Sequence, residues 1–461
     1  MGTIRLVRIL LWGILPEKWI KGERRRLGNK QQLKKELNLA AALALVVGMV
    51  IGSGLFIKAG KVMELAGNSN MALLAWAAGG IITLCAGLTI AELGACIPQT
   101  GGVYAYLENI YGKFPAFLFG WVQSVIYGPA TIAALALYFA ALFLPFFTLP
   151  DTWQKGVAMC VVLLLGSINC LGAKYGGYIQ SAATVAKFVP ILLIVTFGLL
   201  QGENQVLGVP VSERGSMGAA ILATLWAYDG WVGVSYVAGE MKDPGKQLPR
   251  SIFVGLSIVI TAYLAMNIAL LHILPAQDMV ALGTQAAGTA AGLLFGAFGG
   301  KLINIGILIS IFGTLNGYIL TNSRVPFAMA ERGVIPLAAV LSRVHSSWGT
   351  PVYATLLELG LATILILFWK PDSLTDIAMF IIWAFYILAF TAVFILRRRQ
   401  QPGTAYSYQV PLYPMVPLVA IGGAGYIVIS MFFDKPLDAC WAVLWVAAGI
   451  PLFFFRKTVE K

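Results

Sequence analysis

Charged residues are scarce in this sequence. They make up 11% of its 461 residues, and only two residues are histidine, whereas a soluble domain carries roughly 25% charged residues. So few charges cannot cover the surface of a water-soluble chain of this length. The composition therefore excludes an ordinary soluble protein.

Cysteine is equally rare, and the five cysteines lie within or at the edges of apolar stretches. Their spacing resembles neither a metal site nor a disulfide framework. The sequence also has no nucleophile elbow, phosphate-binding loop or metalloprotease signature. We therefore predict that the protein is not an enzyme and binds neither a metal nor another cofactor.

Apolar stretches are abundant instead, since 59% of the residues are hydrophobic. Stretches near or above the ~20 residues that cross a bilayer recur along the whole chain. The prediction is an all-α membrane protein with 12 transmembrane helices. They span 38–58, 71–96, 115–144, 154–172, 180–200, 217–239, 251–274, 302–323, 350–369, 374–396, 413–432 and 436–455.

The net charge of +12 is placed unevenly. If both termini are cytoplasmic, most of the Lys and Arg residues fall on the inner side, as the positive-inside rule requires. We predict a multi-pass membrane protein with both termini in the cytoplasm. The first 37 residues are predicted to form a basic amphipathic segment on the inner leaflet, and a disordered basic tail is the alternative.

The first span, 38–58, is interrupted by Gly52, Ser53 and Gly54. Unpaired backbone groups cost several kcal/mol in hydrocarbon, so irregular backbone persists there only where it lines a cavity or meets a ligand. A second break is predicted near Asp229 and Gly230 in the sixth span. Two interrupted helices in corresponding halves of a chain indicate the binding site of a transporter.

The two predicted breaks offer complementary groups to a ligand. Free amides at the start of a half-helix attract a carboxylate, because the helix dipole is positive there. Backbone carbonyls around Val50, Trp226 and Asp229 can accept hydrogen bonds from an ammonium. A zwitterionic α-amino acid satisfies both sets, whereas close packing of helices through small residues is the alternative explanation for the glycines.

Several segments, in order along the chain, resemble the L-type amino acid transporters of the amino acid, polyamine and organocation superfamily. They are Val47–Phe56, Ala91–Leu93, Gly101–Leu107, Ala227–Trp231 and Gly239–Pro244. Further segments are most similar to the bacterial serine/threonine exchangers of this family, namely Ile126–Ala130, Lys174–Gly177 and Val410–Pro414. The resemblance extends from about Glu36 to the C-terminus, and it implies a protein of the plasma membrane, bacterial in origin.

The resemblance implies a LeuT-like fold of two inverted five-helix repeats, 38–200 and 217–396, with helices 1 and 6 discontinuous and helices 11 and 12 in 413–455. It also implies a sodium-independent antiporter that exchanges small neutral L-amino acids, such as serine, threonine or alanine, by alternating access. Proton-coupled uptake by the same fold and an amino acid sensor that transports nothing are the alternatives.

The resemblance also implies the site. The substrate-binding residues would be Val50, Gly52, Ser53, Gly54, Leu55, Trp226, Ala227, Asp229, Thr314 and Asn316. Trp226 would occupy a gating position, and Tyr263 would line the substrate path. Thr314, Asn316 and Tyr263 have an alternative explanation, since membrane helices also use such groups to hydrogen-bond one another.

Lys187 lies within the fifth predicted span, where an ammonium costs roughly 2.5 to 3.5 kcal/mol by insertion scales. By resemblance, this lysine occupies the place where related symporters bind sodium, and it ties the first break to the fifth and eighth helices. It would then be a coupling residue, together with the gating positions Trp226 and Tyr263. A lysine that snorkels to the surface is the alternative.

Partners are predicted from the same resemblance. The loop Phe146 to Gln154 lacks the cysteine that joins animal L-type transporters to a heavy subunit, so no disulfide-linked heavy subunit is expected. The expected partners are small L-amino acids and the lipid bilayer, with no nucleic acid. Glu92 and Glu240, near cytoplasmic span ends, are predicted to pair with basic loop residues.

Overall fold

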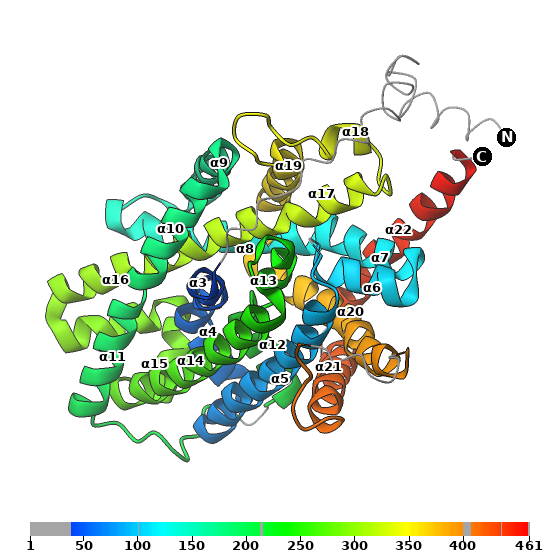
Figure 1. The fold of residues 1–461 in the computed structure, drawn as a ribbon. Helices are drawn as coiled ribbons and strands as arrows, with labels where there is room; N and C mark the ends of the chain where they lie inside the picture. The colour runs from blue at the N-terminus through cyan, green and yellow to red at the C-terminus, as the bar shows by residue number, and fades with distance from the viewer. Residues whose placement is uncertain (1–37, 100, 213–214, 400–406, 435, 460–461) are drawn as a thin grey trace. The chain divides into compact units, whose positions relative to one another are not determined.

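The computed structural model describes residues 38–99, 101–212, 215–399, 407–434 and 436–459. Within these ranges the regular structure consists of helices, and a single isolated bridge between Asn68 and Pro210 is the one β-type pairing. The predicted all-α class is confirmed (Figure 1). The predicted amphipathic segment, 1–37, lies outside the described residues.

Each of the twelve predicted spans coincides with helix. In the described residues, nine helices are long and apolar enough to cross a membrane, and a bent helix pair adds a tenth. Two shorter apolar helices, α12 (Met217–Ala227) and α19 (Val352–Phe368), match the remaining two stretches. The chain is therefore a multi-pass membrane protein.

The other membrane helices have these bounds: α5 Ser69–Cys96, α7 Lys113–Val122, the π-helix η1 Gln123–Tyr127, α8 Gly128–Phe143, α9 Gln154–Leu171, α10 Ala173–Ala186, α11 Phe188–Gln201, α14 Pro244–Ile273, α16 Ala286–Asn322, α20 Pro371–Arg399, α21 Met415–Asp434 and α22 Pro436–Val459. Shorter helices connect them: α6 Val103–Tyr111, η2 Leu144–Phe147, η3 Asp151–Trp153, η4 Ala238–Glu240, α15 Ala276–Leu282, η5 Gly283–Gln285, α17 Arg324–Glu331 and α18 Ala338–Leu341. Helix α16 is two helices joined at Gly296 (φ +71). Gly300 lies against Gly292, and Gly288 lies against Asn304, so the chain folds back at Gly296 and the predicted span 302–323 lies in the second of the two helices.

The first span consists of α3 (Leu39–Val50) and α4 (Gly54–Ala66), which are bent by 41° at the break between them. Asn38 caps the start of α3, because its side chain accepts a hydrogen bond from the amide of Ala41 at 2.9 Å. Ile51 leaves the helical region with ψ 88. The break therefore lies where the glycine triplet predicts it.

The sixth span is also interrupted. Helix α12 ends at Ala227, residues 228–232 form turns, and the short helix α13 (Gly233–Tyr236) follows. Gly230 has φ +109, a conformation that glycine adopts without the steric cost of a side chain. The second predicted break is present at its predicted residues.

The two interrupted spans pack on each other. Helix α4 contacts α12, and α3 contacts α13, so each half of one span meets a half of the other. Helices α10, α14 and α16 also pack against α3, which lies among them near the middle of Figure 1. Large apolar side chains such as Phe298, Phe368 and Phe433 are exposed on the outside, as a lipid-facing surface requires.

Candidate functional site

The first break exposes backbone donors inside the protein. Among the described residues, the amides of residues 52 to 55 have no backbone acceptor, whereas the amides of Phe56 and Ile57 bond to the Ser53 carbonyl. The Ser53 hydroxyl is buried and has no hydrogen-bond partner. Helix α4 therefore begins with free donors at its positive end, the arrangement that holds an anion.

Packing accounts for the glycines of this break. A methyl group at Gly52 would lie 2.7 Å from Thr314 Oγ1, and one at Gly54 would lie 2.3 Å from the Cα atom of Ala227. Both positions thus require glycine because the neighbouring helices approach so closely. The free amides, and not the choice of glycine, are what point to a ligand.

Tyr263 on α14 joins the two breaks. Its buried hydroxyl lies 2.7 Å from the carbonyl oxygen of Val50 and 2.8 Å from that of Ala227. It therefore donates to the last carbonyl of α3 or to the last of α12. Of the carbonyls predicted to bind the substrate ammonium, those of Val50, Trp226 and Asp229, Tyr263 bonds to that of Val50, and at the second break it bonds to Ala227 instead. The phenol thus donates its proton where the substrate ammonium is predicted to donate.

Lys187, fully buried between α10 and α11, directs its ammonium to the end of α3. Its Nζ atom donates to the carbonyl of Gly48 at 2.6 Å, to that of Ile51, and to Thr314 Oγ1 at 3.4 Å. A cation at this position neutralises the negative end of a helix dipole. These contacts are the ones that the predicted tie between the first, fifth and eighth helices requires.

Thr314 supports the same carbonyls from α16. Its hydroxyl lies 3.2 Å from the carbonyl oxygens of Gly48 and Ile51. Ser310, one turn earlier on α16, donates to Ile51 at 3.3 Å. The first break is thus held from the eighth span by two hydroxyls, of which the sequence predicted only one.

Asp229 at the second break is held by two tyrosines that were not predicted. Its Oδ2 atom accepts hydrogen bonds from Tyr127 on η1 and, at 2.6 Å, from Tyr318 on α16. The Asp229 side chain is buried, so a cationic substrate group would have to compete with both phenols. The carbonyl of Trp226 accepts from the Asp229 amide at 3.2 Å.

Asn316 is not brought to the breaks. Its side chain donates to the carbonyl of Gly176 at 2.9 Å and accepts from Asn169 at 2.8 Å, so it bonds α16 to α9 and α10. The Asn316 side chain is thus engaged in interhelical hydrogen bonds, which is the alternative explanation that the sequence offers for it. Trp226 is buried on the last turn of α12, beside the second break.

The π-helix η1 marks Tyr127 as a candidate site residue, and only the structure shows it. A π-turn adds one residue to a helical turn and is frequent at functional sites. It widens the third span directly before Gly128 and Pro129. The sequence shows the Tyr-Gly-Pro segment but not this change of hydrogen-bonding register.

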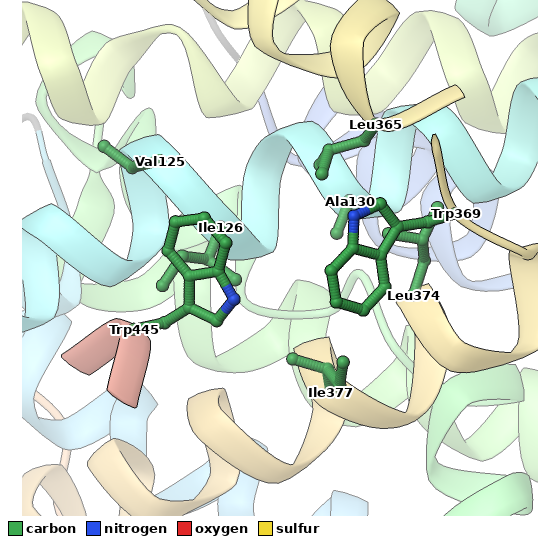
Figure 2. Close-up of a pocket in the computed structure, with 8 residues that line it drawn as sticks. All are labelled: Val125, Ile126, Ala130, Leu365, Trp369, Leu374, Ile377 and Trp445. Atoms are coloured by element: carbon green, nitrogen blue, oxygen red, sulfur yellow. The ribbon is translucent and has the colours of Figure 1, made fainter. Parts of the chain in front are cut away.

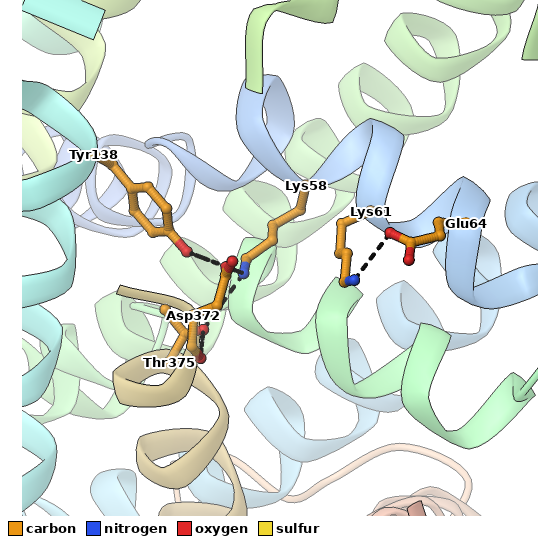
Figure 3. A network of polar contacts seen from close by, with 6 residues as sticks. All are labelled: Lys58, Lys61, Glu64, Tyr138, Asp372 and Thr375. Carbon is orange, nitrogen blue, oxygen red and sulfur yellow. Dashed lines mark hydrogen bonds and ion pairs between the residues drawn. The ribbon is translucent and has the colours of Figure 1, made fainter. Parts of the chain in front are cut away.

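A polar network ties the second half of the first span to two other spans (Figure 3). Lys58 Nζ on α4 lies 2.7 Å from Asp372 Oδ1 on α20 and 3.1 Å from the Tyr138 hydroxyl on α8. Tyr138 also donates to Asp372 at 2.6 Å. Lys58 is 3% exposed, so this ion pair satisfies a buried charge.

Glu92 closes a second network at the other ends of the spans. Its two oxygens accept a pair of 2.7 Å bonds from Arg397, and the amide of Val410 donates to it at 2.6 Å. Burial and the Glu92 charge raise the pKa of Tyr408. The predicted pairing of Glu92 with a basic residue is confirmed; the Glu240 side chain lies outside the described part of the chain.

An apolar hollow lies beside the third span (Figure 2). Six aliphatic side chains and the indoles of Trp369 and Trp445 line it. It has no charged group that could bind a carboxylate or an ammonium. The hollow is therefore unsuited to an amino acid, and the helix breaks are the better candidate for the substrate.

Comparison with known proteins agrees with this geometry. Residues 37–455 match the sequence profile of the family described as amino acid permease. The serine/threonine exchanger SteT of Bacillus subtilis (strain 168) is 48% identical over 427 residues, 92% of this chain and 97% of that protein. The large neutral amino acids transporter small subunit 2 of Mus musculus is 31% identical over 449 residues, 93% and 82% of the two chains. The human Asc-type amino acid transporter 1 is 30% identical over 436 residues, 92% and 82% of the two chains.

The profile covers most of the chain, and the predicted resemblance is confirmed by relatives that align along nearly their whole length. The members found are transporters and exchangers, not enzymes. The chain therefore belongs to the amino acid permease family.

Proposed function

We propose that this chain exchanges small neutral L-amino acids across a bacterial plasma membrane, without sodium and by alternating access. The observation that carries the proposal is the pair of facing breaks, with free amides at residues 53 to 55, the Gly52 amide beside the Tyr263 hydroxyl, and the carbonyls of Val50 and Ala227 opposite. A relative named as a serine/threonine exchanger supports it, and one named as a large neutral amino acids transporter small subunit supports amino acid transport in general.

The substrate carboxylate would accept hydrogen bonds from the amides of Gly52, Ser53, Gly54 and Leu55. The substrate ammonium would donate to the carbonyls of Val50 and Ala227, replacing the hydroxyl of Tyr263. Both substrate charges then lie at helix ends of opposite polarity, which suits a zwitterion. The Ser53 hydroxyl, which has no partner, is available to a substrate carboxylate or hydroxyl group.

The ammonium of Lys187 would replace a bound coupling ion. Its ammonium already occupies the carbonyl oxygens of Gly48 and Ile51, groups of the kind that bind sodium in transporters with broken helices. A tethered cation at these oxygens leaves no need for a dissolved one. Sodium independence follows from this arrangement.

The proposed architecture consists of inverted repeats, 38–200 and 217–396, followed by helices 11 and 12. The charge distribution favours cytoplasmic termini. We expect the chain to act without a disulfide-linked heavy subunit, because the segment from Phe146 to Gln154 has no cysteine to join one. Among the residues proposed for the site, Asn316 is omitted because of its interhelical bonds.

Counterflow in proteoliposomes tests the proposal. Purified protein is reconstituted with unlabelled L-serine inside, and uptake of labelled L-serine from sodium-free buffer is measured. Uptake should require amino acid inside and should not change when sodium is added. Uptake into empty liposomes driven by a pH gradient would instead establish proton-coupled transport, and binding without uptake in any condition would establish a sensor.

A further inference from the structure

Glu358 on α19 is a buried acid with no part in the proposed substrate site. It is 1% exposed, and neither of its carboxyl oxygens has a hydrogen-bond partner in the described structure. It is also the only charged residue between 351 and 369. An ionisable side chain at such a place is expensive and points to a function.

Two amide side chains from other spans surround the same point. A methyl group at Gly128 would lie 3.1 Å from Glu358 Oε1 and 3.2 Å from Asn322 Nδ2, so both side chains approach this glycine. Gln123 Nε2 bonds to Asn322 Oδ1 at 3.4 Å. The remaining amide atoms, Gln123 Oε1 and Asn322 Nδ2, are buried without partners.

No cation of the described residues neutralises Glu358. The titratable groups on the elements packed against α19 are Tyr127 on η1, Tyr138 on α8, Lys155, Cys160 and Cys170 on α9, Lys301 and Tyr318 on α16, and Arg324 and Glu331 on α17. Tyr353 is on α19 itself, and Tyr236 on α13 lies within electrostatic range. None of them forms a hydrogen bond or ion pair with either Glu358 oxygen.

A bound proton removes the cost of this arrangement. An unpaired carboxylate in an apolar interior loses several kcal/mol of hydration, whereas the neutral acid loses far less. The acid also gains a donor. Its carbonyl oxygen can accept from Asn322 Nδ2, which lies against the same glycine, and the unpartnered acceptor of this cluster is Gln123 Oε1, on the amide that bonds to Asn322. The two unpartnered amide atoms thus complement a carboxylic acid.

The same two helices connect Glu358 to the second break. Gln123 is four residues from Tyr127, and Asn322 is four residues from Tyr318, and both tyrosines donate to Asp229. A change of charge at Glu358 therefore acts on the two segments that hold the break of the sixth span. Gly128, which the acid approaches, directly follows the π-helix η1.

We propose that Glu358, with Gln123 and Asn322, forms a proton-binding site that controls the rate of exchange. The closed packing described here requires the protonated acid, because the carboxylate has no partner in it. Glu358 deprotonated at high pH would hold the protein in conformations that admit water to the carboxyl. This inference rests on the proposed exchange for its transport readout, and exchange should slow as the pH rises.

Serine counterflow across a series of pH values, equal on both sides of the membrane, tests this site. The wild-type rate should fall by up to about tenfold per pH unit once Glu358 deprotonates. Glu358→Gln, which keeps the shape of the neutral acid, should exchange at all these pH values at nearly the acidic wild-type rate. Glu64→Gln, at an exposed acid paired with Lys61, should keep the wild-type profile.

A wild-type rate independent of pH, or a Glu358→Gln variant with the wild-type pH profile, would overturn the proposal. A rate that follows sodium concentration instead would assign the site to a metal cation and also overturn the proposal.

Chemical labelling measures the protonation of Glu358 without depending on transport. Dicyclohexylcarbodiimide modifies protonated carboxyls in apolar surroundings. Mass spectrometry of the wild type should place the adduct on Glu358, decreasing as the pH rises. An adduct without counterflow would contradict the exchange function alone, and the absence of an adduct at every pH would contradict the proton site.

Discussion

The ammonium of Lys187 lies 2.6 Å from the carbonyl oxygen of Gly48, although 139 residues separate the two along the chain. The first span is thereby fixed to the fifth at the point where its helix ends. Since the carbonyl of Ile51 accepts from the same ammonium, one side chain satisfies two backbone groups that the break leaves unpaired.

Replacement of this side chain should disable exchange. In Lys187→Ala, two buried carbonyls lose a charged donor worth roughly 1.5 to 3 kcal/mol each, so we expect counterflow to fall at least about a hundredfold while the protein still elutes as a folded monodisperse peak. Lys61→Ala, at a lysine that is 40% exposed in its side chain, is the matched control and should exchange normally. Undiminished counterflow in Lys187→Ala would contradict the coupling role.

In Tyr263→Phe, bound serine should raise the melting temperature by more than it does in the wild type. The carbonyls of Val50 and Ala227 lose their hydroxyl donor, at a cost of about 1 to 3 kcal/mol for unsatisfied buried groups. The melting temperature should fall without serine and recover more with saturating serine than in the wild type, because the substrate ammonium then supplies the donor. Thermal unfolding with and without serine measures this.

The control for that variant is Tyr426→Phe, at a tyrosine that is 46% exposed. It should match the wild type in both conditions. If serine raises the melting temperature of Tyr263→Phe no more than that of the wild type, the ammonium does not bind these carbonyls.

Gly54→Ala should separate the two interrupted spans. Its methyl group would lie 2.3 Å from the Ala227 Cα atom, which the backbone must shift to relieve, so we expect a loss of stability of about 1 to 3 kcal/mol and strongly reduced counterflow. Gly422→Ala, at a glycine with no neighbour within 4 Å, should leave both unchanged. Normal counterflow in Gly54→Ala would show that the close approach of the breaks is dispensable.

Glu92→Gln should lower the free energy of unfolding because it leaves the charge of Arg397 without a partner. It should not affect the substrate site. Breaking a buried pair costs about 3 to 5 kcal/mol, reduced here because the Arg397 side chain is 20% exposed. The double variant Glu92→Gln with Arg397→Met should be more stable than Glu92→Gln alone, since no uncompensated charge remains. Equal melting temperatures of the single and double variants would contradict this explanation. Serine affinity should be the same in all three proteins.

Much of the fold could be predicted because a bilayer demands long apolar stretches and penalises exposed backbone. All twelve spans and both breaks follow from hydropathy and from the glycines at 52, 54 and 230. The helix that precedes the eighth span and folds back on it at Gly296 could not, since its Gly- and Ala-rich sequence does not show where the chain reverses.

The polar contacts were less accessible to prediction. Lys187 stands out in the sequence because a charge within a span is rare, whereas Tyr127 and Tyr318 look like ordinary aromatic residues until the packing brings them to Asp229. For Asn316 the sequence leaves both the substrate path and interhelical hydrogen bonding open, because it does not reveal which side of α16 faces the breaks. Distances between residues a hundred or more apart depend on how the spans pack, which residue spacing alone does not determine.

A cation tethered to the chain has a consequence for the cell. A dissolved ion can bind on one side and leave on the other, and its gradient then concentrates the substrate. Lys187 cannot leave, so no sodium gradient performs work through this position. Strict exchange therefore leaves the total amino acid content of the cell constant and alters only its composition, and every molecule gained is matched by one that the cell's metabolism must replace.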